Sequence, residues 1–222
     1  RAGGVGTRSL SVAEERDLAA ETVSALVQRF DVPVSIDTWH AEVAAAAYDA
    51  GAALGNDMSG FYDPDYLPFA QRAGAAVVAT HLRRPPPGTP DPHAAYADVV
   101  ADVVSALRDM LSHAGAAGIP ADRIILDPGL DLGKSWGDSL RLLARLDAIA
   151  ALGRPVLLAA SQKIFLGRLL GLEAAERGDA TVAACVWGIE RGARILRVHD
   201  ARSARHAADL VCALRAKLST EP

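Results

Sequence analysis

The chain has little cysteine, few aromatic residues and no long apolar run. Cys185 and Cys212 are the only cysteines among 222 residues, and aromatic residues make up 5%. No apolar stretch approaches the ~20 residues that a membrane-spanning helix needs. These absences speak against a disulfide framework and a membrane partner, and we expect a cytoplasmic protein.

An excess of positive charge is lacking as well. The formal net charge is −4 at pH 7 and the sequence pI is near 5.9. Such a chain has no bulk attraction for phosphate backbones, so we expect no nucleic-acid partner.

What is present is enough apolar material for one sizeable core. Half of the residues are hydrophobic and 23% are charged, which is the balance of a globular protein. The length suits a single domain and no interdomain linker is visible, so we expect one domain over residues 1–222. The biased stretch at 83–92 is too short for a linker and is interpreted as a loop at the mouth of a site.

The chain alternates between short apolar runs and stretches of helical periodicity, which is typical of β/α units around a parallel sheet. The predicted strands are 32–37, 53–57, 75–81, 123–127, 155–161 and 193–200. The predicted helices are 41–50, 64–73, 96–117, 140–152, 165–191 with a break near Gly171 and Gly178, and 203–218. A further helix at 12–30 precedes all strands, with Ser11 and Glu14 as a capping box, so the order is α(βα)6.

Six parallel strands fit either an open doubly wound sheet or most of a barrel. No Gly-rich turn follows the first strand, as a dinucleotide fold would require, and nearly every strand ends in a polar residue, as in barrel enzymes. We therefore expect an α/β fold of the (β/α)8 TIM barrel type. Since such a barrel closes with eight strands, the first two are expected to be missing from this chain, which begins at Arg1 without Met.

Polar side chains cluster at the carboxyl ends of the predicted strands. The ends read Asp37-Thr38, Asn56-Asp57, Thr80-His81, Asp127, Ser161-Gln162-Lys163 and Arg197-Val198-His199-Asp200. Carboxylates and an amide suit a heterocycle edge with N–H donors and N and O acceptors. Arg197 and His199, two apart on one predicted strand, are expected to point the same way and to suit a phosphate or diphosphate.

Other motifs in the sequence are weaker indications of function. Gly129 to Ser135 resembles a P-loop but has three residues between its glycines instead of four. His81 and His199 have no neighbours at metal-ligand spacing, so we expect no metal held by protein ligands. Lys163 leaves open a Schiff-base aldolase, and Lys134 leaves open a bridge to a carboxylate such as Asp131.

Taken in order and spacing, these strings resemble dihydropteroate synthase. The resemblance rests on Ser35-Ile-Asp-Thr38, Asn56-Asp-Met-Ser-Gly60, Thr80-His81, Leu126-Asp-Pro-Gly-Leu-Asp-Leu-Gly-Lys134, Ser161-Gln-Lys163 and Arg197-Val-His-Asp200, and it spans the whole chain. It implies a (β/α)8 barrel and a transferase of folate biosynthesis. That enzyme joins 6-hydroxymethyl-7,8-dihydropterin diphosphate to 4-aminobenzoate and yields 7,8-dihydropteroate and pyrophosphate.

The resemblance also implies roles for individual residues. The pterin would be held by Asp37, Asn56, Asp127 and Lys163, and the diphosphate by Arg197 and His199. Ser161 and His81 would be further substrate-binding residues, and the residue after Lys163 would line the aminobenzoate site with the Lys163 stem. The expected catalytic set is Asp37, Asp127, Lys163 and Arg197. The family also implies Mg²⁺ on the diphosphate and a homodimer through the late helices, for which residues 185–191 offer an apolar stripe.

The chain departs from the family pattern near the second substrate. Gln162 stands where an Arg is usual, Leu132 where a Phe is usual, and Thr80-His81-Leu82 where Met-His-Met is usual. Two alternatives therefore stay open: a diverged pterin-binding homologue without synthase activity, and a pterin-binding domain of the methyltransferase type.

Overall fold

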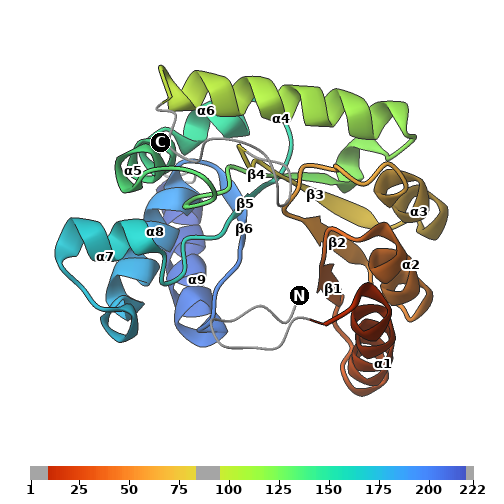
Figure 1. Ribbon diagram of the computed structural model, residues 1–222. Coiled ribbons are helices and arrows are strands. Elements are labelled where there is room, and N and C mark those ends of the chain that lie inside the picture. The colour runs from red at the N-terminus through yellow and green to blue at the C-terminus, as the bar shows by residue number, and fades with distance from the viewer. Residues whose placement is uncertain (1–9, 84–95, 219–222) are drawn as a thin grey trace. The chain divides into compact units, whose positions relative to one another are not determined.

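The computed structural model describes residues 10–83 and 96–218 (Figure 1). The chain forms two compact units, one of residues 1–90 and 106–125 and one of residues 91–105 and 126–222. The boundary runs within α4 (Val99–Ala116) and β4 (Ile124–Asp127). The single domain over 1–222 stays a prediction. The loop predicted at 83–92 lies, beyond Arg83, outside the described residues.

The first unit contains three parallel strands in chain order, β1, β2 and β3 (Figure 1). Helices α1, α2 and α3 contact one another in series. The elements are α1 (Val12–Arg29), β1 (Ser35–Asp37), α2 (Ala41–Asp49), β2 (Leu54–Asp57), α3 (Tyr66–Ala73), β3 (Ala76–Thr80), the second half of α4 and a 3-10 turn at Ala121–Arg123.

The second unit repeats this pattern with β4, β5 and β6, again parallel and in chain order. Helix α8 packs against α9 and β6, and α5 packs against α7. The elements after β4 are α5 (Trp136–Ala144), α6 (Leu146–Ala150), β5 (Val156–Leu158), α7 (Ile164–Leu170), a 3-10 turn at Ala174–Glu176, α8 (Gly178–Glu190), β6 (Ala193–Leu196) and α9 (Ala201–Leu218).

The predicted α/β class and all six predicted strands are confirmed, although the strands are shorter than predicted. The break in the predicted helix at 165–191 is confirmed between α7 and α8. Helix α3 ends where predicted, at Gly74, whose φ of 64° is the left-handed conformation that glycine adopts without a steric cost. No described helix has the length and apolar character of a membrane span.

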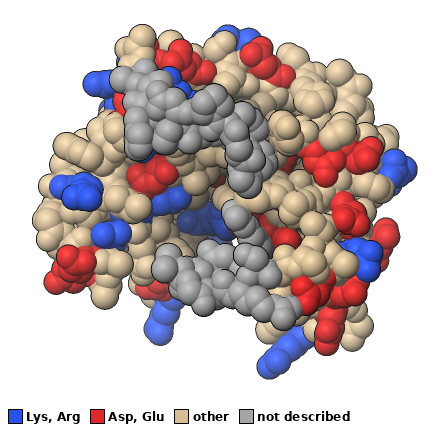
Figure 2. All heavy atoms as spheres, viewed as in Figure 1, with Lys and Arg blue, Asp and Glu red and all other residues tan. Residues whose placement is uncertain are grey.

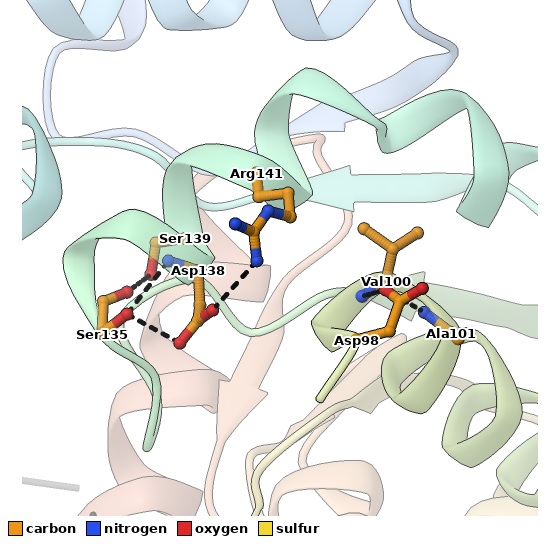
Figure 3. Close-up of polar contacts among 7 residues, drawn as sticks. All are labelled: Asp98, Val100, Ala101, Ser135, Asp138, Ser139 and Arg141. Atoms are coloured by element: carbon orange, nitrogen blue, oxygen red, sulfur yellow. Dashed lines mark hydrogen bonds and ion pairs between the residues drawn. The ribbon is translucent and has the colours of Figure 1, made fainter. Parts of the chain in front are cut away.

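Capping residues set where three helices begin. The predicted capping box is confirmed, because Ser11 Oγ accepts from Glu14 N and Glu14 Oε2 accepts from Ser11 N. Figure 3 shows two more caps, Asp98 at the start of α4 and Ser135 at the start of α5. The prediction that a helix begins at 140 is wrong by four residues, because Ser135 and Asp138 bond reciprocally and start α5 at Trp136.

Candidate functional site

In the first unit, the ends of β1 and β2 place an acid next to an amide. Asp37 and Asn56 are register partners, and parallel partners project to the same face of the sheet. Asn56 Nδ2 donates to Asp37 Oδ1 at 3.3 Å. Asn56 is 6% exposed, and its Oδ1 has no hydrogen-bond partner in the described part of the chain. A buried acceptor without a partner is costly unless a ligand supplies a donor.

Asp57, the next residue, belongs to the opposite face of β2. Gly55 lies on that face too, and a Cβ there would overlap the hydroxyl of Tyr48 and come within 2.6 Å of that of Tyr66, so the face is packed by α2 and α3. Asp57 Oδ1 accepts from Ser59 N at 2.6 Å and Oδ2 from Phe61 N at 2.7 Å. Both oxygens therefore hold the turn that follows β2. Asp57 thus has a structural role, unlike its neighbour Asn56 on the other face of the strand.

The end of β3 is buried. Thr80 is 1% exposed and His81 5% exposed, and Thr80 Oγ1 has no hydrogen-bond partner among the described residues. The predicted substrate-binding residue His81 directly follows this strand, so the carboxyl ends of all three strands of the first unit carry polar side chains.

In the second unit, Asp127 ends β4 as a carboxylate that is 3% exposed. Gly129 N donates to Asp127 Oδ1 at 2.7 Å. Burial raises the pKa of Asp127, whereas the Gly129 hydrogen bond and the positive charges of Lys163, Lys134 and Arg197 oppose that rise. Lys163 and Arg197, both predicted site residues, thus lie close enough to Asp127 to act on it electrostatically.

Lys163 follows β5 in a tightly held loop. Its neighbour Gln162 has φ +54°, a conformation that is costly for a residue other than glycine and persists where the surroundings hold it. Gln162 N donates to Thr181 Oγ1 at 3.0 Å, and Arg177 Nη1 donates to Gln162 O at 3.0 Å. The start of α8 therefore fixes the residue before Lys163, which is a role for Thr181 and Arg177 that no sequence signal indicated.

Arg197 and His199 lie beyond the end of β6 at Leu196. The prediction placed both residues on one strand, and this is wrong. The rule that side chains two residues apart point the same way holds only within a strand, so it does not apply to Arg197 and His199. Arg197 N donates to Leu158 O at 2.9 Å, which brings the loops after β5 and β6 together. Ser161 Oγ lies 2.7 Å from His199 Nδ1 and accepts from His199 N at 3.2 Å, so these two predicted residues are joined.

Lys134 makes backbone contacts in the second unit that the sequence did not indicate. Its Nζ donates to Gly129 O at 2.9 Å and to Leu132 O at 3.1 Å. Burial lowers its pKa to about 7, against the opposing charge of Asp127. The sequence spacing of Lys134 and Asp131 indicates a bridge between the two side chains. It does not indicate hydrogen bonds from Lys134 to these two backbone carbonyl groups.

The charged groups of the rest of the surface are mixed. Figure 2 shows Lys and Arg interspersed with Asp and Glu over the visible face. Among the described residues no group of three or more His, Cys, Asp or Glu could hold a metal ion. Within the second unit, the buried acid Asp127 and the exposed Arg197 and His199 suit a ligand with a polar ring and an anionic group.

Comparison with known proteins agrees with this chemistry. Residues 2–199 match the family described as "Pterin binding enzyme". The chain is 34% identical over 210 residues to a dihydropteroate synthase of Bacillus subtilis, covering 94% of this chain and 71% of the relative. It is 35% identical over 189 residues to a Mycobacterium leprae protein named "Inactive dihydropteroate synthase 2", covering 83% of this chain and 65% of that protein.

A solved structure is also similar. The dihydropteroate synthase of Xanthomonas albilineans, in complex with 7,8-dihydropteroate, has a TM-score of 0.85 and 35% identity, covering 98% of this chain and 78% of that one. Together, the family match, the identity over most of the chain and the structural likeness show that the chain belongs to the pterin-binding enzyme family, among the dihydropteroate synthases.

Proposed function

We propose that this chain condenses 6-hydroxymethyl-7,8-dihydropterin diphosphate with 4-aminobenzoate to give 7,8-dihydropteroate and pyrophosphate. The observation that carries the proposal is the buried Asp127, which lies in the field of Lys163, Lys134 and Arg197. A carboxylate surrounded by cations suits a reaction in which a ring becomes cationic while an anion departs.

The pterin is the ligand for the amide and acid groups. Asp37, Asn56, Asp127 and Lys163 would hold it, and His81 would be a further substrate-binding residue. The unpartnered Asn56 Oδ1 calls for an N–H donor such as a pterin ring provides. Asp127 offers a carboxylate whose Oδ1 is already oriented by Gly129, so the ring meets a fixed acceptor.

The diphosphate is the ligand for the groups after β5 and β6. Arg197 would bind its oxygens as a fork of N–H donors. His199, held by Ser161, would donate a further hydrogen bond. Both Arg197 and His199 are exposed, as a group that binds and releases an anion must be.

The charges indicate how the reaction proceeds. The bond between the pterin CH₂ carbon and the diphosphate oxygen breaks, and its electron pair leaves with the diphosphate. The neutral amine of 4-aminobenzoate forms the new C–N bond and then loses one proton. Asp37 and Asp127 stabilise the cationic pterin, and Arg197 stabilises the departing oxygens, which for a well-placed donor contributes ~3–4 kcal/mol. Lys163 orients Asp127 and the ring, and the amine needs position more than a strong base.

We propose Mg²⁺ as the cofactor, held by the diphosphate. The described residues offer no protein cage for an ion, and Mg²⁺ often binds through substrate phosphates and waters. Bound in this way, the ion would neutralise charge on the leaving group. Arg197 and His199 would add hydrogen bonds to the same diphosphate.

The second substrate would lie beside Ile164 and the stem of Lys163. Ile164 is 60% exposed at the first turn of α7, so it offers apolar contact to an aromatic ring. Gln162 and Leu132 depart from the family pattern near the proposed aminobenzoate site. The affinity for 4-aminobenzoate is therefore the quantity to measure first.

We further propose that the strands belong to a (β/α)8 barrel and that the protein is a cytoplasmic homodimer. In the predicted apolar stripe at 185–191, Cys185 and Ile189 are buried and only Trp187 is a large exposed apolar side chain, at 43%. Leu210, Leu214 and Leu218 instead form an exposed apolar row on α9, at 61%, 56% and 73% exposure. A second copy covering this row would remove it from water, and sedimentation of Leu214→Glu against the wild type tests this.

A pterin-binding homologue without turnover is the second candidate. It is favoured by the departures at Gln162 and Leu132 and by the name of the Mycobacterium leprae relative. The test is pyrophosphate release by the protein at its full natural length, with the pterin diphosphate, Mg²⁺ and 4-aminobenzoate. Release that depends on 4-aminobenzoate supports the synthase, and pterin binding without release supports the silent homologue.

A further inference from the structure

The turn after β4 is closed around one partly buried ammonium group. Lys134 Nζ bonds the carbonyl oxygens of Gly129 and Leu132, at 2.9 and 3.1 Å. Leu132 N donates to the same Gly129 oxygen at 3.0 Å. These three hydrogen bonds tie residues 129–134 into a ring.

The same turn carries the contact that orients Asp127. Gly129 has φ +65°, and its N–H is aimed at Asp127 Oδ1. Asp131 has φ +63°, which costs ~1–3 kcal/mol for a residue other than glycine and persists only where neighbours hold it. The Lys134 bonds, together with the donation from Asp131 N to Ser139 Oγ at 3.0 Å, supply that hold.

The turn also reaches the helix that begins after Lys163. Asp131 Oδ2 accepts from Phe165 N at 3.3 Å, in the first turn of α7. Lys163 is the N-cap residue of α7, but its side chain makes no cap bond. Asp131 therefore supplies the missing cap and fixes the backbone next to Lys163.

We propose that Lys134 is a positioning residue of the pterin site: it holds the turn 129–133 so that Asp127 and Lys163 are both oriented toward the pterin. The inference rests on the proposed function. It assigns to Lys134 no contact with substrate, because its hydrogen bonds to Gly129 and Leu132 act through the turn.

The charged groups that face Lys134 come from every side of the turn. They are Asp127 on β4, Lys163 before α7, Asp131 within the turn and Asp138 on α5. Burial lowers the pKa of Lys134 to about 7, the acids raise it and Lys163 lowers it further. As the pH rises through about 7 the ammonium becomes an amine, and its hydrogen bonds lose the charge assistance that makes them about twice as strong.

The test is calorimetric binding of 6-hydroxymethyl-7,8-dihydropterin between pH 6 and pH 9. This ligand lacks the diphosphate, so Arg197 and His199 contribute little. The variants are Lys134→Met and Lys134→Arg, with Lys217→Met as the matched control on α9 in the same unit. We expect Lys134→Met to weaken binding about tenfold at pH 6, as for the loss of a charged hydrogen-bond donor, and Lys217→Met to bind as the wild type does.

Lys134→Arg gives the sharper readout because arginine keeps its charge. Across this pH range the wild-type affinity is expected to fall severalfold relative to that of Lys134→Arg, in which the decline through pH 7 is absent. A merely structural lysine would lower the melting temperature without this difference in pH profile. If Lys134→Met does not fold, the comparison of wild type with Lys134→Arg decides alone.

Two outcomes would overturn the inference: wild-type affinity in Lys134→Met, or the same pH profile in wild type and Lys134→Arg. A wild type that binds no pterin at any pH is a different failure, since it would overturn the proposed function itself.

Discussion

Two buried aspartates end strands of this molecule, and their surroundings differ. Asp57 ends β2 and Asp127 ends β4, both are at most 3% exposed, and burial raises the pKa of each. The oxygens of Asp57 are both taken by backbone N–H groups of one turn. Asp127 receives one backbone N–H among the described residues and lies in the field of three cations.

Burial alone therefore does not mark a functional carboxylate. An acid whose oxygens are both bonded by a turn stabilises that turn. An acid with one bonded oxygen, near cations and next to predicted substrate residues, has capacity left for a ligand. We therefore assign Asp57 to folding and Asp127 to the pterin.

The largest expected effect is on pterin binding by Asp127→Asn. The variant keeps an acceptor for Gly129 N but loses the negative charge, so we expect affinity for 6-hydroxymethyl-7,8-dihydropterin to fall about 100-fold. Calorimetry at pH 7 measures this. Unchanged affinity would show that Asp127 does not bind the pterin, and the proposed difference between Asp127 and Asp57 would be wrong.

The next largest effect distinguishes binding of the diphosphate from binding of the pterin ring. Arg197→Ala should weaken the pterin diphosphate about tenfold or more, because it removes a charged donor to the diphosphate oxygens. The same variant should bind the free pterin within about threefold of the wild type, as competition binding can show. Equal weakening of both ligands would contradict the proposed division between ring and anion.

Asp57→Asn should act on stability and spare the ligand. An amide offers one acceptor oxygen in place of two, so either Ser59 N or Phe61 N loses its partner inside the fold. An unsatisfied buried donor costs ~1–3 kcal/mol, and we expect a loss of that size in the free energy of unfolding in urea. A loss of pterin affinity without a loss of stability would show that Asp57, too, meets the substrate.

The smallest effect is a gain of stability in Asp127→Asn. Because the folded-state pKa of Asp127 is raised, the folded chain binds its proton more tightly than the unfolded chain does. Ionisation therefore lowers the stability of the wild type as the pH rises above about 4, and the cost is fully present above the raised pKa. The variant lacks this cost, so thermal unfolding at pH 4 and pH 7 should show its stability advantage over the wild type growing with pH.

Much of this molecule could be predicted from its sequence, for identifiable reasons. Strands and helices follow from apolar periodicity, and the predicted strand ends place Asp37, Asn56 and Asp127 within one residue of the ends of β1, β2 and β4. Lys163 lies five residues beyond the end of β5 at Leu158, so its predicted place at a strand end is wrong. The substrate roles of these residues stay predictions.

The sequence could not separate Asp57 from Asn56, because which face of β2 each occupies depends on the register. It also could not indicate that Lys134 bonds two carbonyl groups or that Thr181 holds Gln162. Those contacts depend on backbone conformations with positive φ, at Asp131 and Gln162, that no side-chain pattern encodes.

The most direct test of the account is thermal unfolding with and without saturating 6-hydroxymethyl-7,8-dihydropterin, for the wild type, Asp57→Asn and Asp127→Asn. A ligand that binds only the folded state raises its melting temperature. We expect Asp57→Asn to melt lower than the wild type but to keep the full ligand-induced rise. Asp127→Asn should melt as high as the wild type or higher and show a much smaller rise. A ligand-induced rise that survives in Asp127→Asn and disappears in Asp57→Asn would contradict the assignment of the two acids.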